Sequence, residues 1–329
     1  MSNYIKAALP LFACASLLVF GCDLATEPLS DDASTDPANQ EAEAMEGGAF
    51  AGWIPALDIE SAPPGAHEEF NTASAEGCPF ISRDGKKFFM ASDRAGGEGG
   101  LDIWVSTREH VSDPWGEPQN AGAPINTEHN DFCPTLARDG RTFFFASNRP
   151  GFCGTTPNAD LYSSRLGPSG FGPVRHLGCE VNSGADEHGP FPMIMPGEGV
   201  VLFFSSAREA VPGDPPGDHD IYMSRFERGA FGAAELVEGV NTEFQDGQPN
   251  VRRDGRELFF YSDRPGSEGN DIYSTSRALA SHPWSTPVNM GPNVNSSGSE
   301  TRPSLSWDGR SLYFGSTRAG SSDIYVTRR

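Results

Sequence analysis

One sequence pattern occurs five times between residues 71 and 329, and this repetition restricts the possible folds more than any other feature. Each copy begins with Asn followed by Thr or Ser, carries Asp or Glu five residues after the Asn, and has Pro three residues further on. Each then ends an aromatic run with Ser-x-Arg, and these arginines are 54 to 59 residues apart. A period in this range, built from short strands and turns, is typical of a solenoid or a propeller.

The interior of each copy predicts consecutive antiparallel strands. Four copies place Asp-Gly between two apolar runs, a strong hairpin signal because Gly tolerates positive φ; the third copy has Met-Pro-Gly-Glu-Gly at 195–199 instead. Aromatic runs such as Phe-Phe-Phe at 143–145 do not alternate with polar residues, so both faces of that strand must be covered. A third strand is predicted from the Asp-aliphatic-aromatic triplets, which begin at Asp102, Asp160, Asp220, Asp271 and Asp323.

A fourth strand is marked by Phe or Trp followed by a small residue, as at Trp115 and Phe231. Four strands per repeat predict an all-β fold, a β-propeller of five four-stranded blades, with six blades as the alternative. The last copy ends without a fourth strand, whereas residues 50–57 form an unattached piece of that kind. We therefore expect residues near 50–60 to complete the final blade, which would remove an exposed sheet edge.

The repeat resembles the WD40-like (PD40-type) repeat of TolB-like β-propellers over residues 71–329. The resemblance rests on the Asp-Gly turn, the aromatic run, Ser-x-Arg and the Asp-Ile-Tyr triplet, all recurring in register. It implies the propeller fold. It leaves the function open, since such repeats occur in periplasmic scaffolds, peptidase propeller domains and some polysaccharide lyases.

The N-terminus predicts export and lipid attachment. Lys6 precedes an apolar run at 7–20, which has the length of a secretory signal core, and Val-Phe-Gly-Cys at 19–22 resembles a bacterial lipobox. We expect a lipoprotein signal peptide at 1–21, a lipidated Cys22, a disordered acidic tether at 22–49 and a propeller domain at 50–329. An ordinary signal peptide or a short anchor is the alternative.

Four cysteines remain in the propeller, an even number in an oxidising compartment. Strand counting places Cys153 and Cys179 on one face of the second blade, and Cys78 and Cys133 at equivalent places on adjacent inner strands. We predict the disulfides Cys153–Cys179 and Cys78–Cys133. Free buried thiols are the alternative, and a metal site is disfavoured because no C-x-x-C spacing occurs.

The repeated carboxylates lie on the predicted innermost strands and would form a channel ring able to bind a cation or a sugar. The competing interpretation makes them structural, accepting hydrogen bonds from the backbone or from a repeat arginine, because a group present in every blade is most simply part of how blades are built. The ring consists of Glu76, Asp131, Glu187, Asp246 and Glu300.

Function is better sought where the repeat is irregular, in the second and third copies. The candidate binding site consists of His129, Asp131, Glu187, His188 and His219. Imidazoles and carboxylates in a cleft would suit a divalent cation, but lone histidines in loops are more often solvated, so we expect no cofactor and keep the cation as a minor alternative. The chain has no G-x-S-x-G or H-E-x-x-H motif, and no catalytic residue is assigned.

Two functions follow as hypotheses. The favoured one is a non-catalytic, lipid-anchored scaffold of the bacterial cell envelope, facing the periplasm or the exterior, that binds an envelope protein, peptide or glycan. The alternative is a carbohydrate-active enzyme, a polysaccharide lyase or glycosidase, using channel carboxylates and the histidines. A net charge of −21 argues against a nucleic-acid partner. We expect a monomer.

Overall fold

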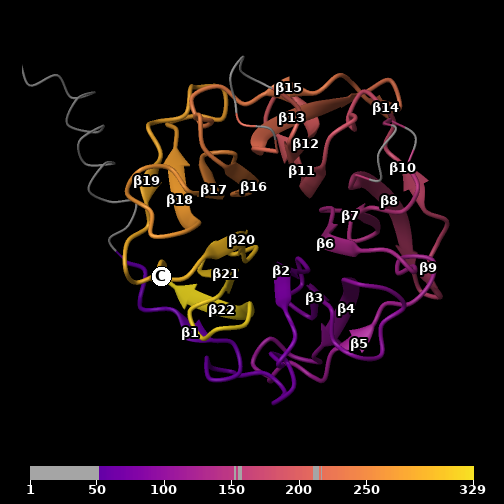
Figure 1. Ribbon diagram of the computed structural model, residues 1–329, viewed down its shortest axis with the longest axis vertical. Helices are drawn as coiled ribbons and strands as arrows, with labels where there is room; N and C mark the ends of the chain where they lie inside the picture. Colours follow the sequence, from indigo (N-terminus) through magenta and orange to yellow (C-terminus); the bar gives the residue numbers. More distant parts are fainter. Residues whose placement is uncertain (1–51, 152, 155–157, 210–214, 216) are drawn as a thin grey trace, which may run out of the picture. The chain divides into compact units, whose positions relative to one another are not determined.

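The computed structural model describes residues 52–151, 153–154, 158–209, 215 and 217–329. In this part of the chain, five small antiparallel sheets are arranged around an axis with one strand of each facing the centre (Figure 1). The predicted five-bladed all-β propeller is therefore confirmed. The predicted signal peptide, Cys22 and tether lie outside the described residues. Among the described residues, no helix is long and apolar enough to cross a membrane.

Each blade has three long strands and a two-residue outer strand. From the axis outward, blade 1 contains β2 (Glu76–Ile81), β3 (Lys87–Ser92), β4 (Asp102–Thr107) and β5 (Gln119–Asn120). In the same order, blade 2 contains β6 (Asp131–Leu136), β7 (Thr142–Ser147), β8 (Asp160–Gly167) and β10 (Arg175–His176). Blade 3 contains β11 (Glu187–Met195), β12 (Gly199–Ser206), β13 (Asp220–Glu227) and β15 (Glu235–Leu236). Blade 4 contains β16 (Asp246–Val251), β17 (Glu257–Ser262), β18 (Asp271–Ser276) and β19 (Val288–Asn289). Blade 5 contains β20 (Glu300–Leu305), β21 (Ser311–Ser316), β22 (Asp323–Arg328) and β1 (Leu57–Asp58). Blades 2 and 3 each add a short strand, β9 (Gly170–Phe171) and β14 (Ala230–Phe231), paired with the third strand.

The aromatic second strands form the core between blades. Phe143, Phe144 and Phe145 of β7 are all buried, so neighbouring blades cover both faces of the strand as the sequence predicts. The outer strands begin four residues after the Phe or Trp that was expected to mark them, as β5 does after Trp115. Trp115 itself is buried against Phe88, with ring centroids 5.3 Å apart.

Every inner strand contains a β-bulge at the same place. The register of β2 against β3 shifts between Gly77 and Phe80, and the other four inner strands shift at the equivalent position. The residue before the repeat proline there has a positive φ of 50° to 61°, which is rare for a residue other than Gly. These residues are Cys78, Cys133, Gly189, Gln248 and Arg302.

The N-terminal end of the described chain completes blade 5, which confirms the predicted closure. Leu57 and Asp58 of β1 pair with Val326 and Tyr325 of β22. The pairing continues before the strand, where the Ile54 amide donates to the Arg328 carbonyl at 2.9 Å. The last blade thus contains strands from both ends of the described chain, and β1 covers the outer edge of β22.

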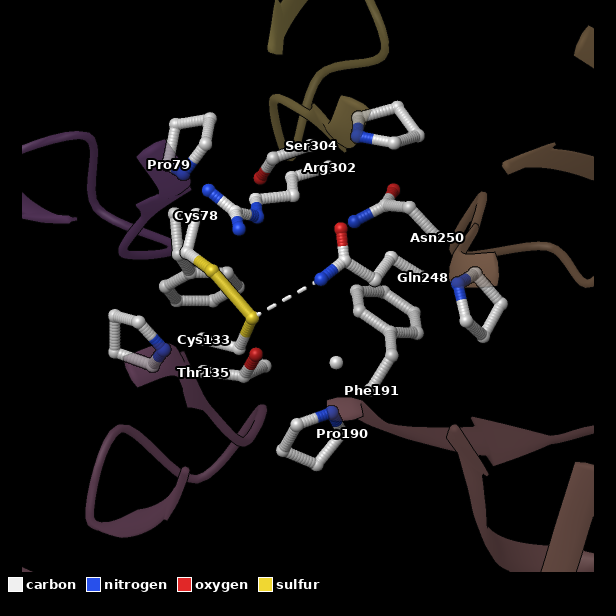
Figure 2. Close-up of a pocket in the computed structure, with 15 residues that line it drawn as sticks. Cys78, Pro79, Cys133, Thr135, Pro190, Phe191, Gln248, Asn250, Arg302 and Ser304 are labelled. Atoms are coloured by element: carbon white, nitrogen blue, oxygen red, sulfur yellow. Dashed lines mark hydrogen bonds between the residues drawn. A yellow bond between two sulfur atoms is a disulfide. The ribbon is translucent and has the colours of Figure 1, made fainter. Parts of the chain in front are cut away.

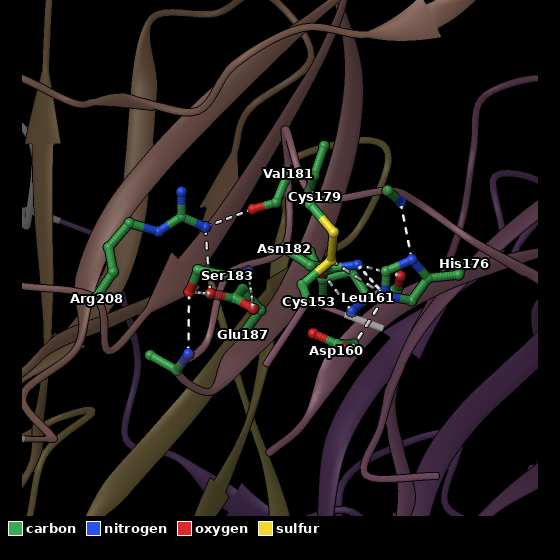
Figure 3. The surroundings of a disulfide bond; sticks show 12 residues. Cys153, Asp160, Leu161, His176, Cys179, Val181, Asn182, Ser183, Glu187 and Arg208 are labelled. Atoms are coloured by element: carbon green, nitrogen blue, oxygen red, sulfur yellow. Dashed lines mark hydrogen bonds and ion pairs between the residues drawn. A yellow bond between two sulfur atoms is a disulfide. The ribbon is translucent and has the colours of Figure 1, made fainter. Parts of the chain in front are cut away.

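Both predicted disulfides are present. Cys78–Cys133 joins the inner strands of blades 1 and 2 and closes 55 residues, while Cys153–Cys179 joins two loops of blade 2. By loop entropy a link of the first length stabilises the fold by about 4 kcal/mol. Figure 3 shows the second disulfide beside His176, whose Nε2 lies 3.9 Å from Cys153 Sγ and 3.1 Å from Asp160 Oδ2.

Replacing Trp53 should test how much the closure contributes to stability. Trp53 is 4% exposed, packs edge-on against Phe259 and lies under the Arg329 guanidinium. We expect Trp53→Ala to lower the free energy of unfolding by about 3–5 kcal/mol in urea titrations, since it leaves a cavity where the segment before β1 packs against blades 4 and 5. Ile54→Ala is the matched control, because that neighbouring side chain is 50% exposed and its loss should cost less than about 0.5 kcal/mol. Equal losses of unfolding free energy in both variants would contradict a contribution of Trp53 to the closure of blade 5.

Candidate functional site

The five repeated carboxylates do not face an open channel. Glu76, Asp131, Glu187, Asp246 and Glu300 are each 0% exposed. Each accepts hydrogen bonds from the backbone amide and the hydroxyl of the Thr or Ser four residues earlier; Asp131, for example, accepts from Thr127 N at 2.7 Å and Thr127 Oγ1 at 2.8 Å.

An arginine completes each of these clusters. The Arg of Ser-x-Arg forms an ion pair with the carboxylate of its own blade, as Arg94 does with Glu76 at 2.9 Å and Arg149 with Asp131 at 2.6 Å. The same guanidinium donates to the backbone of the inter-blade segment and lies over an aromatic ring of the third strand, as Arg149 does over Tyr162. Figure 3 shows the cluster of blade 3, where Arg208 reaches Glu187 and the Val181 carbonyl. The five carboxylates therefore have the structural role given as the competing interpretation, in which they accept hydrogen bonds from the backbone and from the repeat arginines.

The histidines of the candidate binding site do not form one cluster. His188 and His219 stack with ring centroids 4.6 Å apart, and Phe132 meets the His188 ring edge-on at 5.2 Å. His129 instead lies 3.9 Å from Glu128, with no described contact to either of the other two. Across the described residues, no group of three or more His, Cys, Asp or Glu side chains is arranged to hold a metal ion. Burial raises the pKa of Glu187, despite hydrogen bonds from Ser183 and Ser206.

The axis is narrow and is lined by the residues flanking the repeat prolines. This throat is a space of about 40 Å³. Figure 2 shows the Cys78–Cys133 disulfide on one side of it, Gln248 on the opposite side, and Arg302 reaching toward Cys78. Gln248 Nε2 lies 3.3 Å from Cys133 Sγ, and its Oε1 is buried without a partner in the described structure. The Arg302 guanidinium packs against Gly77, where a Cβ would lie 2.2 Å from Nη1. Burial lowers the pKa of Arg302.

The throat opens on the face that carries the hairpin turns between the first two strands of each blade, here called the hairpin face. The opening is a hollow of about 70 Å³ that shares Phe80, Phe191 and Asn250 with the throat. Five residues at one repeat position, four after the proline, surround it. This mouth ring consists of Arg83, Arg138, Ile194, Arg253 and Trp307.

A groove between blades 2 and 3 continues from the mouth. It encloses about 620 Å³ and shares Ala137, Arg138 and the segment 192–194 with the mouth hollow. Apolar groups such as Phe226, 43% exposed, lie along it together with polar groups such as Ser163 and Arg175. A volume of this size is in the range of small-molecule binding sites. Mouth and groove together form one cleft.

The search for functional residues in irregular loops overlooked this cleft. Its signal was in the sequence: the residue before each Asp-Gly turn is Arg83, Arg138, Arg253 or Trp307, so three copies place an arginine and one a tryptophan at the same repeat position. The alignment of the copies therefore contained the mouth ring. Strand geometry was needed to place that position on the axis.

This chain is similar to several proteins of known structure. No protein-family profile matches the chain, and no curated protein sequence is significantly similar to it. The endo-arabinase from Bacteroides thetaiotaomicron is 15% identical with a TM-score of 0.56, covering 84% of this chain and 97% of its own. The alpha-L-arabinofuranosidase from Lactobacillus brevis is 11% identical with a TM-score of 0.54, covering 80% and 94%. A putative TolB from Agrobacterium tumefaciens is 17% identical with a TM-score of 0.47, covering 84% and 83%.

The similar structures with TM-scores of 0.5 or more support the propeller fold and correct the favoured functional hypothesis. The similar structures with the higher scores are carbohydrate-cleaving enzymes, so the preference for a non-catalytic binding scaffold was wrong and the carbohydrate-active alternative agrees better. The error came from treating the missing hydrolase motifs as a sign of missing catalysis. Glycoside cleavage needs neither motif, because its usual groups are two carboxylates.

His188 should make stability depend on pH. Burial, with the neighbouring His219 and Arg302, lowers its pKa to about 3, against about 6.5 in an unfolded chain. Between these values the unfolded state binds a proton that the folded state does not, so the free energy of unfolding falls as the pH falls below about 6.5.

Urea titrations at about pH 6.5 and pH 5 would measure this effect. We expect the wild type to lose about 2 kcal/mol more over that interval than His188→Gln. His129→Gln is the control for loss of a histidine away from this pair, since His129 lies near Glu128 instead. Parallel pH curves for wild type and His188→Gln would contradict the lowered pKa.

Proposed function

We propose that this chain is a carbohydrate-active enzyme that binds a glycan in the cleft of the hairpin face and cleaves it. The observation that carries the proposal is the cleft itself, which runs from the axial mouth into the groove between blades 2 and 3. Its size suits a short saccharide. Its mixture of apolar and hydrogen-bonding side chains also suits a sugar, which presents C–H faces and hydroxyl groups together.

The charged groups of the cleft fit this use better than the repeated carboxylates do. The latter are sealed by their arginines and cannot meet a substrate without dismantling the blade. Asp139 lines the groove and its side chain is 46% exposed, so a substrate can reach this carboxylate, which is held by hydrogen bonds from the Thr142 amide and Thr142 Oγ1. An ionised carboxylate is the state that a base or nucleophile requires in glycoside cleavage.

The repeat type and the N-terminus support a cellular setting for this activity. We propose a TolB-like propeller of WD40-like repeats, carried by a lipid on Cys22 and exposed to glycans in the bacterial cell envelope. The support is the repeat pattern and the Gly-Cys that ends the apolar segment at 7–20. The two disulfides are in keeping with an oxidising compartment.

Cleavage of polysaccharides by the purified propeller is the direct test of the activity. We expect release of reducing ends, or of unsaturated sugars, from at least one member of a panel of neutral and acidic polysaccharides. Trp307→Ala should lower kcat/KM at least tenfold, equivalent to about 1.4 kcal/mol, because the indole lines the mouth. Arg141→Ala is the control, an exposed residue of a hairpin on the same face that does not line the cleft.

Two outcomes would contradict the proposed activity. One is binding of glycans without cleavage of any member of the panel. The other is cleavage that Trp307→Ala and Arg141→Ala affect equally, which would place the active site away from the mouth.

The lipid anchor has its own test in cells. We expect the wild type expressed in a bacterial host to incorporate labelled fatty acid and Cys22→Ser to remain unlabelled, because the thioether to the lipid cannot form without the thiol. Cys14→Ser is the control and should be labelled as the wild type is, since Cys14 lies within the predicted signal peptide. Equal labelling of Cys22→Ser and the wild type would contradict the lipoprotein assignment.

A further inference from the structure

The mouth ring gathers positive charge in an otherwise acidic protein. Arg83 comes from blade 1, Arg138 from blade 2 and Arg253 from blade 4, and all three border one hollow. The whole chain has 45 acidic and 24 basic side chains. Three guanidiniums at one opening therefore form a positive site on a protein of negative net charge, and these like charges repel one another.

These three arginines lack anionic partners in the described structure. No ion pair or side-chain hydrogen bond is present for Arg83, Arg138 or Arg253 among the described residues. The neighbouring Arg252, in contrast, is paired: it lies 3.6 Å from Asp254 and 3.7 Å from Glu257.

The aspartates next to the ring are engaged in their own hairpins. Asp84 accepts hydrogen bonds from Ser82 Oγ and the Lys86 amide, and Asp308 accepts from Ser306 Oγ and the Arg310 amide. Their charge reduces the local potential without binding the ring arginines. The guanidinium N–H groups of the ring remain available to a ligand.

An aromatic surface lies among the charges. The Trp307 ring centroid is 5.1 Å from Arg83 Cζ and 5.9 Å from Arg138 Cζ. Such contacts hold the two guanidiniums beside the indole. An aromatic face next to fixed cations can bind the C–H face of a sugar while the cations bind an anionic substituent.

The throat adds a fourth cation below the ring. Arg302 has no ion pair in the described structure, and it shares the throat with the unpartnered Gln248 Oε1. Gln248 is 7% exposed. The described residues that line the throat and the mouth thus include Arg302, the three arginines of the mouth ring and the free Gln248 Oε1 but no carboxylate, because the inner-strand carboxylates are all sealed in their clusters.

We propose that the mouth ring selects an anionic glycan, with a sugar carboxylate or sulfate held by Arg83, Arg138 and Arg253 and the sugar ring placed on Trp307. The guanidinium fork matches both anions in geometry. The small mouth hollow receives the anionic group, and the groove between blades 2 and 3 receives the rest of the chain. This inference rests on the proposed function and gives its substrate class.

Binding of matched oligosaccharides to the purified propeller tests the inference. The probes are an oligogalacturonide, its fully methyl-esterified form, a sulfated galactan oligomer and the same galactan oligomer without sulfate, each titrated calorimetrically. We expect at least one of the two anionic probes to bind, with affinity at least tenfold above its neutral counterpart. The two anionic probes distinguish carboxylate from sulfate as the recognised group.

Variants and salt locate the interaction. Arg83→Ala combined with Arg138→Ala should weaken binding of the anionic probe at least tenfold, since charged hydrogen bonds are lost. Raising NaCl from about 50 to about 500 mM should also weaken binding. Arg141→Ala is the matched control and should bind as the wild type does. Circular dichroism would establish that the double variant is folded, and Arg253→Gln provides a milder second variant for the same measurement.

The outcomes separate the two proposals. If neutral and anionic probes bind equally, or if the double variant binds like the wild type, the inference about charge is wrong while glycan binding in the cleft stands. If none of the four probes binds and no polysaccharide is cleaved, the proposed function and the inference are both overturned.

Discussion

The fold depends on a buried carboxylate in every blade that is fully supplied with hydrogen-bond donors. A charged group without solvent is costly unless it is paired and hydrogen-bonded. Here a backbone amide, one or two hydroxyls and a guanidinium surround each carboxylate, and the guanidinium also binds the backbone between blades. The Asn at the start of each repeat extends this link: Asn126 Oδ1 accepts from the Ile103 amide of the preceding blade at 2.9 Å. The repeated residues therefore hold adjacent blades together.

Much of this arrangement could be predicted from the sequence because the responsible residues recur in register. The repeat predicted five blades, the Asp-Gly pairs predicted hairpins, and the missing fourth strand of the last copy predicted closure by residues near 50–60, where Leu57 and Asp58 pair with β22. Both disulfides followed from counting strands. In each case a local pattern fixes a local geometry, and the propeller then assembles these units by repetition.

The candidate site was harder to predict because it depends on which side chains converge across blades. The sequence put His129 and His188 in the same candidate site, yet only His188 lies against His219. The bulge before the repeat proline moves one residue per blade toward the axis, and sequence alone gives no sign of a left-handed residue such as Gln248. The mouth ring was present in the alignment, but neighbouring positions in five blades become one surface only after the ring has closed.

The bulge divides each inner strand into a part that joins the blades and a part that lines the axis. The carboxylate end of the strand belongs to the clusters that join the blades, whereas the residue before the proline and the residue before the Asp-Gly turn face the axis. Cys, Gly, Gln and Arg all occupy the first of these positions with nearly the same backbone. Mutation can therefore alter the chemistry of the axis one blade at a time without disturbing the groups that assemble the propeller. A scaffold divided in this way can acquire new ligand preferences by single steps.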